Sequence, residues 1–328
     1  MLSFIRISIL AILASLLSPG LMSGQNIDSL LNVADTASGK NFIEVNIKIS
    51  KYYFTRNPVL ALEYAKKLKS LSPKYLKDTA TQIKILNTIG DAQYWLDDMA
   101  SSLDYGLQIL HLQEKINDSL GIAKTLNNMA VIYSQQGKLE KALDILKKSL
   151  EIRKKLGDEK LIASNYNNLG QIYYKLDRDS IAMEYFQKSV AIQEKYKNYE
   201  LLINGYNNVA VIYMKEKKYS DAIFYLTKSL NITDSLEMIR QKPVILTNLG
   251  EIFNETGEIT QAINWYKQSF KIAKEIKNFN MQLIVVEKLK DIFIEQGEFK
   301  KALNYSMLIN EIKDTINQRN TDDKIEQL

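Results

Sequence analysis

The stretch that decides the fold is Asn127-Asn128-Met129-Ala130-Val131-Ile132-Tyr133, because close copies of it recur along the chain at a fixed interval. A repeat is sought first, since overlooking one leads to the wrong fold. Further copies begin at Asn167, Asn207 and Thr247, always at the same spacing, with a small residue in fourth place and an aromatic in seventh. Downstream, an alanine and a serine keep the same interval: Ala142, Ala182, Ala222, Ala262 and Ala302, and Ser149, Ser189, Ser229 and Ser269. The sequence therefore predicts a structural unit of about 40 residues, a length within the range of repeat proteins.

Each unit is predicted to be a helix hairpin. Its apolar residues follow a helical spacing, and a glycine at Gly137, Gly257 or Gly297 separates the aromatic of the first helix from the alanine of the second. The small residue of the first helix lets the two helices approach closely. One hairpin cannot bury its apolar stripe alone, so neighbouring hairpins must stack and share a core.

This order of small residue, aromatic, glycine, alanine, aromatic and small residue resembles the tetratricopeptide repeat. The second helix carries the match in Ala182, Phe186 and Ser189, and again in Ala262, Tyr266 and Ser269. The usual unit of that family has about 34 residues, so the chain is similar to the long-repeat variety found in kinesin light chains and in many bacterial sensors. We expect the extra residues in the second helix and the loop after it. The resemblance implies an all-α, α-α superhelix of about six to seven hairpins.

The array is expected over residues 79–316, preceded by a degenerate N-terminal hairpin at 25–78 and followed by a tail at 317–328. In the N-terminal hairpin, Asn57 and Pro58 read as a helix cap and first helical position, and Pro73 as the end of that helix. The six repeats are expected near 83–116, 123–156, 163–196, 203–236, 243–276 and 283–316.

Residues 1–24 differ from the rest of the chain. Arg6 precedes an apolar run that ends near Leu17, and small residues follow up to Gly24. This is typical of a signal peptide, and the run is short for a membrane span. We therefore expect an exported protein, periplasmic or secreted, with an uncleaved N-terminal membrane anchor as the alternative.

The composition indicates no catalytic chemistry. The chain has no cysteine, and its one histidine, His111, is expected on a solvent-facing part of a helix. Adjacent carboxylates such as Asp97-Asp98 lie in a loop, and no glycine-rich phosphate loop occurs. The net charge of +5 is mild and interspersed, which does not favour nucleic acid. We expect no enzyme, no metal, no cofactor and no nucleic-acid partner.

The asparagines of the repeat are the candidate binding residues. On a helical wheel, Asn128 lies nearly opposite the apolar cluster of Met129, Ala130 and Tyr133. In the tetratricopeptide family that stripe lines the concave groove, so the resemblance implies a row of amides that hold the backbone of an extended peptide. An amide has both a donor and an acceptor. The asparagine row is Asn128, Asn168, Asn208 and Asn248, and the flanking row is Asn127, Asn167 and Asn207. The alternative is that these amides bond to a neighbouring helix or to water.

Specificity is expected from residues that change between copies on the same stripe. The candidates are the cations Lys175 and Lys215, together with Gln171, Val211, Glu251, Tyr174, Met214 and Glu255.

The expected function is a non-enzymatic scaffold that binds a protein or peptide segment. The C-terminal stretch from Asn310 is similar to the one that leads into the membrane helix of exported tetratricopeptide sensors. The second hypothesis is therefore the input module of a bacterial signalling system, truncated or acting with a membrane-associated partner. A cytoplasmic regulator that responds to peptides is a third, which the signal peptide disfavours.

Overall fold

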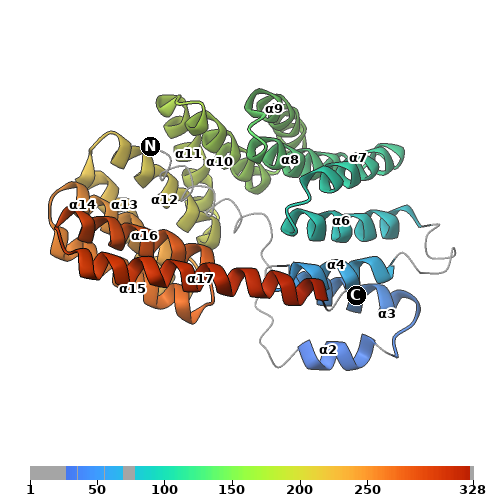
Figure 1. Ribbon diagram of the computed structural model, residues 1–328. Helices are drawn as coiled ribbons and strands as arrows, with labels where there is room; N and C mark the ends of the chain where they lie inside the picture. Colours follow the sequence, from blue (N-terminus) through green and yellow to red (C-terminus); the bar gives the residue numbers. More distant parts are fainter. Residues whose placement is uncertain (1–26, 35, 55, 69–77, 326–328) are drawn as a thin grey trace. The chain divides into compact units, whose positions relative to one another are not determined.

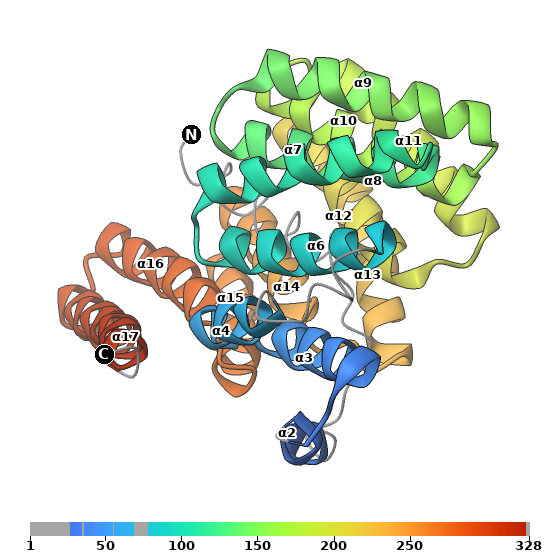
Figure 2. The same ribbon diagram turned by 90° about the vertical axis from the view of Figure 1, so that its right-hand side faces the viewer.

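The computed structural model describes residues 27–34, 36–54, 56–68 and 78–325, so the predicted signal peptide and Pro73 lie outside the described residues. Every element in the described part is a helix (Figures 1 and 2). The helices are α2 (Ile27–Ala34), α3 (Gly39–Tyr53), α4 (Pro58–Lys67), α6 (Thr79–Trp95), α7 (Met99–Lys115), α8 (Ser119–Gln135), α9 (Leu139–Leu156), α10 (Glu159–Lys175), α11 (Asp179–Lys195), α12 (Tyr199–Lys215), α13 (Tyr219–Ser235), α14 (Lys242–Glu255), α15 (Ile259–Glu275), α16 (Phe279–Glu295) and α17 (Phe299–Ile325).

The helices pair as the repeat predicts. The first helices of the six hairpins are α6, α8, α10, α12, α14 and α16, and the second helices are α7, α9, α11, α13, α15 and α17. α12 packs against α13, α13 against α14, and α14 against α15, so each of these hairpins also contacts the next. The all-α fold and the predicted number of hairpins are confirmed.

A left-handed turn residue ends each helix from α6 to α16 at a regular spacing, which is half the sequence repeat. Its φ lies between 51° and 82°, and the N–H of the following residue bonds to a carbonyl five positions back, as from Lys218 to Tyr213 at 2.9 Å. Such 6→1 bonds satisfy the end of a helix. The turn residues are Asp97, Asn117, Gly137, Gly157, Asp177, Lys197, Lys217, Glu237, Gly257, Lys277 and Gly297.

This spacing shows how the residues beyond the usual 34-residue unit are divided between the two helices. α12 and α13 have 17 residues each, and so do α10 and α11. In these two hairpins the helices are equally long, so the expectation that the second helix and its loop take the extra residues is wrong for them. α14 is shorter, with 14 residues, and begins next to Pro243.

The regular interval of the serines has a structural cause. Ser229 Oγ on α13 donates to the carbonyl of Ile203 on α12 at 3.1 Å, and Ser269 Oγ on α15 donates to Pro243 on α14 at 2.8 Å. Ser149 makes the same bond to Ala123 at 2.7 Å. The hydroxyl thus joins the two helices of one hairpin across a close contact.

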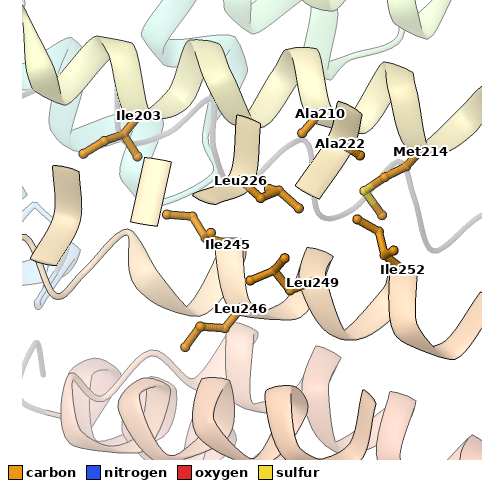
Figure 3. Close-up of a cluster of buried hydrophobic side chains, with 9 residues drawn as sticks. All are labelled: Ile203, Ala210, Met214, Ala222, Leu226, Ile245, Leu246, Leu249 and Ile252. Carbon is orange, nitrogen blue, oxygen red and sulfur yellow. The ribbon is translucent and has the colours of Figure 1, made fainter. Parts of the chain in front are cut away.

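The core between hairpins is built from the small and aliphatic residues of the repeat. In Figure 3, Ala210 and Met214 of α12 meet Ala222 and Leu226 of α13, and Ile252 of α14 completes this part of the cluster. All five are buried. Because the cluster takes residues from two hairpins, neither hairpin covers its apolar surface on its own.

The N-terminal hairpin is α3 and α4. Asn57 caps α4 as predicted, since its side chain accepts from the N–H of Leu60 at 3.0 Å and Pro58 opens the helix. At the other end of the array, α17 continues beyond residue 316 to Ile325, so the described part of the predicted tail extends the last helix.

The described residues up to Ile172 form one compact unit and those from Tyr173 onward form another, with the division inside α10. No helix in the described ranges is long and apolar enough to cross a membrane.

Candidate functional site

The asparagine row lies on the first helices, but its members differ in exposure. Asn128 on α8 is exposed, whereas Asn168 on α10, Asn208 on α12 and Asn248 on α14 are buried. The flanking row is buried throughout, at Asn127, Asn167 and Asn207.

Two members of the asparagine row bond to the flanking row of the preceding hairpin. Asn168 Nδ2 donates to Asn127 Oδ1 at 3.0 Å, and Asn248 Nδ2 donates to Asn207 Oδ1 at 2.7 Å. Both bonds are buried and link residues of successive first helices. These amides therefore brace neighbouring hairpins, which is the alternative that the sequence left open for them.

The bracing leaves hydrogen-bonding groups on α12 unused. Nδ2 of Asn207 and Nδ2 of Asn204 are buried and have no hydrogen-bond partner in the described structure. The two residues lie one turn apart and are only 3% and 6% exposed. A buried donor without a partner costs about 1–3 kcal/mol. Asn204 was not predicted, because the other copies have Lys124, Ser164 and Val244 there and no repeated signal marks it.

The valines of the same stripe are less exposed to solvent than the helical wheel predicts. Val131 and Val211 are buried, and so is Gln171. Side chains opposite the main apolar cluster are thus also covered in these hairpins.

Lys215 does not present a free charge. Its ammonium lies 2.8 Å from Asp177 Oδ1 and 2.9 Å from Asp179 Oδ2, at the turn between α10 and α11 and the start of α11. Desolvation lowers the pKa of Lys215, but the two carboxylates outweigh it and hold the pKa above its usual value. For Lys175, burial lowers the pKa to about 8.

Glu251 lies at the centre of a buried polar cluster that joins three helices. Tyr266 on α15 donates its hydroxyl to Glu251 at 2.7 Å, and Lys288 Nζ on α16 lies 2.7 Å from each carboxylate oxygen. Burial, followed by the charge of Glu251, raises the pKa of Tyr266. The sequence did not single out Lys288, which occupies the position of Asn248 in the next repeat and so takes the place of the asparagine row in the last hairpin.

The ends of the first helices are also joined between hairpins. Tyr219 on α13 donates its hydroxyl to Glu255 of α14 at 2.7 Å, and Gln135 on α8 donates to the hydroxyl of Tyr94 on α6 at 2.7 Å. Residues expected to vary for specificity thus contribute to contacts between repeats.

A sequence profile described as tetratricopeptide repeat matches residues 81–155, 161–235 and 201–275, more than half of the chain. The chain belongs to the tetratricopeptide repeat family. A comparison with curated protein sequences found no match.

Solved structures of other tetratricopeptide-like proteins share the fold. The apo form of RapI is 19% identical with a TM-score of 0.64, and the match covers 84% of this chain and 99% of RapI. A Rap protein complexed with competence and sporulation factor is 19% identical with a TM-score of 0.67, covering 89% of this chain and 80% of that protein. A signal transduction ATPase from Pyrococcus horikoshii with a tetratricopeptide repeat sensor is 18% identical with a TM-score of 0.62, covering 90% of this chain and 45% of that protein.

Three further polar residues of this tetratricopeptide array were considered for catalysis or metal binding: His111, Asp97 and Asp98. His111 is exposed on α7, and no group of three or more histidines and carboxylates that could hold a metal lies within the described residues. Asp98 caps α7 by accepting from the N–H of Ser101 at 3.0 Å, and Asp97 is a left-handed turn residue. These two carboxylates therefore serve the turn between α6 and α7.

Proposed function

We propose that this tetratricopeptide protein is a non-enzymatic, exported scaffold that holds an extended segment of a peptide or protein along its first helices. The candidate residues are Asn127, Asn128, Asn167 and Asn168 in the unit that ends at Ile172, and Lys175, Asn207, Asn208, Lys215 and Asn248 in the unit that begins at Tyr173. In this proposal the amides have two roles, since Asn168 and Asn248 brace the hairpins and the Nδ2 groups of Asn204 and Asn207 donate to the ligand.

The unpartnered amides of Asn204 and Asn207 carry the proposal. A peptide carbonyl is an acceptor that satisfies such a donor once the side chains that cover it move aside, and recovering a buried, unpaired donor is favourable. Asn128 supports it as well, because it is the exposed member of the asparagine row.

The charges of the stripe favour a ligand recognised through its backbone. Lys215 is neutralised by Asp177 and Asp179, and Lys288 by Glu251. An amide pair reads a peptide backbone irrespective of its side chains. We therefore expect a ligand whose binding depends weakly on salt concentration.

The proposal is tested by affinity capture with the full chain from an envelope extract, followed by mass spectrometry and binding of the synthetic peptide that is recovered. Asn204→Val places the residue of Val244 at this position and breaks no hydrogen bond of the protein. We expect this variant to bind the peptide about tenfold more weakly. A tenfold change corresponds to about 1.4 kcal/mol, which is the contribution of one hydrogen bond.

The matched control is Asn264→Val, since Asn264 is exposed on a second helix, α15. The Asn264→Val variant should bind the peptide with the same affinity as the unaltered chain. Equal affinity of the Asn204→Val variant, or no peptide enriched over a bead control, contradicts the proposal. N-terminal sequencing of the mature protein tests export separately.

A second candidate is the input module of a signalling system that works with a membrane-associated partner. It is supported by the similarity in fold to the signal transduction ATPase, whose tetratricopeptide region is a sensor in that protein. The same capture distinguishes the two candidates, because a sensor would recover a membrane signalling protein in a ligand-dependent way.

A further inference from the structure

Arg153 on α9 is a buried charge. The residue is only 2% exposed, and its Nη1 donates to the carbonyl of Leu161 in the first turn of α10 at 2.5 Å. Its Nε is buried and has no hydrogen-bond partner in the described structure. Burial removes water from a guanidinium, and only a counter-ion and further acceptors compensate for that loss. Arg153 therefore has at least one donor left for an acceptor.

Asp158 does not complete the hydrogen bonds of this guanidinium. Its Oδ1 accepts from the N–H of Leu161 at 3.1 Å and so caps the start of α10. Burial lowers the pKa of Arg153 to about 10, and the charge of Asp158 offsets only part of that effect. Because this pKa is still far above neutral pH, the guanidinium remains charged. Its charge is thus only partly balanced.

The repeat shows that packing does not require a charge at this position. The equivalent residues on α7, α11, α13 and α15 are buried and neutral: Gln113, Gln193, Thr233 and Ala273. Gln113 is satisfied within the protein, because its Oε1 accepts from Thr125 Oγ1 on α8 at 3.0 Å. Arg153 is therefore a departure from the repeat that the stability of the hairpin does not explain.

The turn around Arg153 is also more basic than the equivalent turns. Residues 153–160 have a net charge of +2, from Arg153, Lys154, Lys155 and Lys160 against Asp158 and Glu159. The corresponding stretches 113–120, 193–200, 233–240 and 273–280 have net charges between −1 and +1. The three lysines are exposed, so the positive field of this turn extends into solvent.

The surface of this turn is open to an approaching ion. Leu156 is 47% exposed, and no heavy atom lies within 4 Å of a Cβ added to the left-handed turn residue Gly157. An ion that comes from this side reaches the guanidinium of Arg153 once the side chains that cover it move aside.

We propose that the turn between α9 and α10 binds a phosphate ion, with Arg153 as its main ligand. A guanidinium donates from two nitrogens to two oxygens of an oxyanion, and Nε is one such donor. The start of α10 adds the positive end of a helix dipole. Phosphate carries more negative charge near neutral pH than a carboxylate does, which suits a turn with a net charge of +2.

The first test is isothermal titration calorimetry of the full chain with sodium phosphate, with the ionic strength held constant by sodium chloride. The unaltered chain should bind phosphate, and Arg153→Gln should raise the dissociation constant at least tenfold. This substitution introduces the residue of Gln113 and Gln193, so the hairpin should keep its helical circular dichroism. Acetate should bind at least tenfold more weakly than phosphate.

Lys148→Gln is the matched control, since Lys148 is exposed on the same helix and lies outside residues 153–160. It removes the same charge and should bind phosphate like the unaltered chain. Neither variant alters a residue of the proposed peptide site, so the outcome is independent of the proposed function.

Thermal melting gives a second measurement, because an ion that binds only the folded chain raises the midpoint. Phosphate also stabilises proteins by exclusion from their surface, so the decisive quantity is the difference between variants. The rise should be equal for the unaltered chain and Lys148→Gln, and smaller for Arg153→Gln. Absence of phosphate binding to the unaltered chain, or equal binding by Arg153→Gln, overturns the proposal. Acetate that binds as tightly as phosphate overturns the assignment to phosphate.

Discussion

At the scale of single residues, the ring of Tyr266 packs directly against the backbone of Gly250 and fills the space that a side chain there would need. A Cβ added to Gly250 would lie 2.7 Å from Cε1 and 2.8 Å from Cδ1 of the Tyr266 ring. In the preceding hairpin the same two positions hold Ala210 and Leu226, both fully buried. The repeat thus uses glycine beside an aromatic ring and alanine beside leucine.

We expect Gly250→Ala to destabilise the protein by about 1–3 kcal/mol, because it overpacks a close contact. Chemical denaturation measures this loss. In a Tyr266→Leu background, which reproduces the pair of Ala210 and Leu226, the same substitution should cost little. Equal losses in the two backgrounds would show that the ring is not the cause.

A second prediction at this scale concerns Asp91 on α6. Burial raises the pKa of this carboxyl from 3.8 to about 7, with partial compensation by Lys51 on α3. Its contribution to stability is therefore complete below pH 3.8 and is lost as the pH rises through about 7. Relative to the unaltered chain, Asp91→Asn should become more stable as the pH rises over this window, as thermal melting at several pH values would show.

Asp98 is the control of opposite sign for that experiment. The hydroxyl and then the N–H of Ser101 lower the pKa of Asp98, so its contribution is lost as the pH falls through the lowered value. Asp98→Asn should therefore remove stability at neutral pH and less in acid. If the stabilities of the two variants change with pH in the same direction, the raised pKa of Asp91 is wrong.

At the scale of the element, the turn that ends each helix determines the repeat length. Lys217 and Gly257 occupy equivalent left-handed turn positions, with φ of 58° and 82°. A side chain disfavours this region, and glycine does not. A left-handed turn therefore recurs at half the repeat length, even at positions where the sequence has no glycine.

We expect Lys217→Gly to stabilise the protein by about 0.5–1 kcal/mol and Gly257→Ala to destabilise it by a similar amount. No heavy atom lies within 4 Å of a Cβ added to Gly257, so its loss would arise from the backbone alone. Denaturation midpoints of both variants provide the measurement. A gain for Gly257→Ala would contradict the role given to this turn.

At the scale of the whole molecule, stability is a sum of hairpins and of contacts between neighbours. Deletion of residues 199–238 removes α12 and α13 together and joins equivalent turns. The shortened chain should keep α11 packed by a first helix, now α14, and unfold cooperatively at a lower midpoint. Thermal melting followed by circular dichroism tests this.

Deletion of residues 199–218 is the matched control, because it removes α12 alone and also joins equivalent turns. It places α13 directly after α11, so two second helices become neighbours and the core of Figure 3 loses Ala210 and Met214. We expect a large loss of cooperativity. If this variant melts like the first, the single helix and not the hairpin is the unit.

Much of the fold was predictable because its signals are local. The alternation of first and second helices, the breakers at Gly137 and Gly257, and the cap at Asn57 follow from side chains within a few residues of the backbone they act on. The lengths of the helices were not predictable in this way, since the turns at Lys197 and Lys217 use residues that have no strong turn preference.

The sequence by itself determined the hairpin as the unit, the constant interval between its copies and the position of the asparagine row. Only the tertiary structure decided what those asparagines bond to, because the partner of Asn168 or Asn248 lies on another helix, in the preceding hairpin. It also left Asn204 and Asn207 with unused donors, since the partners of a buried side chain are decided by the helices packed around it and not by the residue itself.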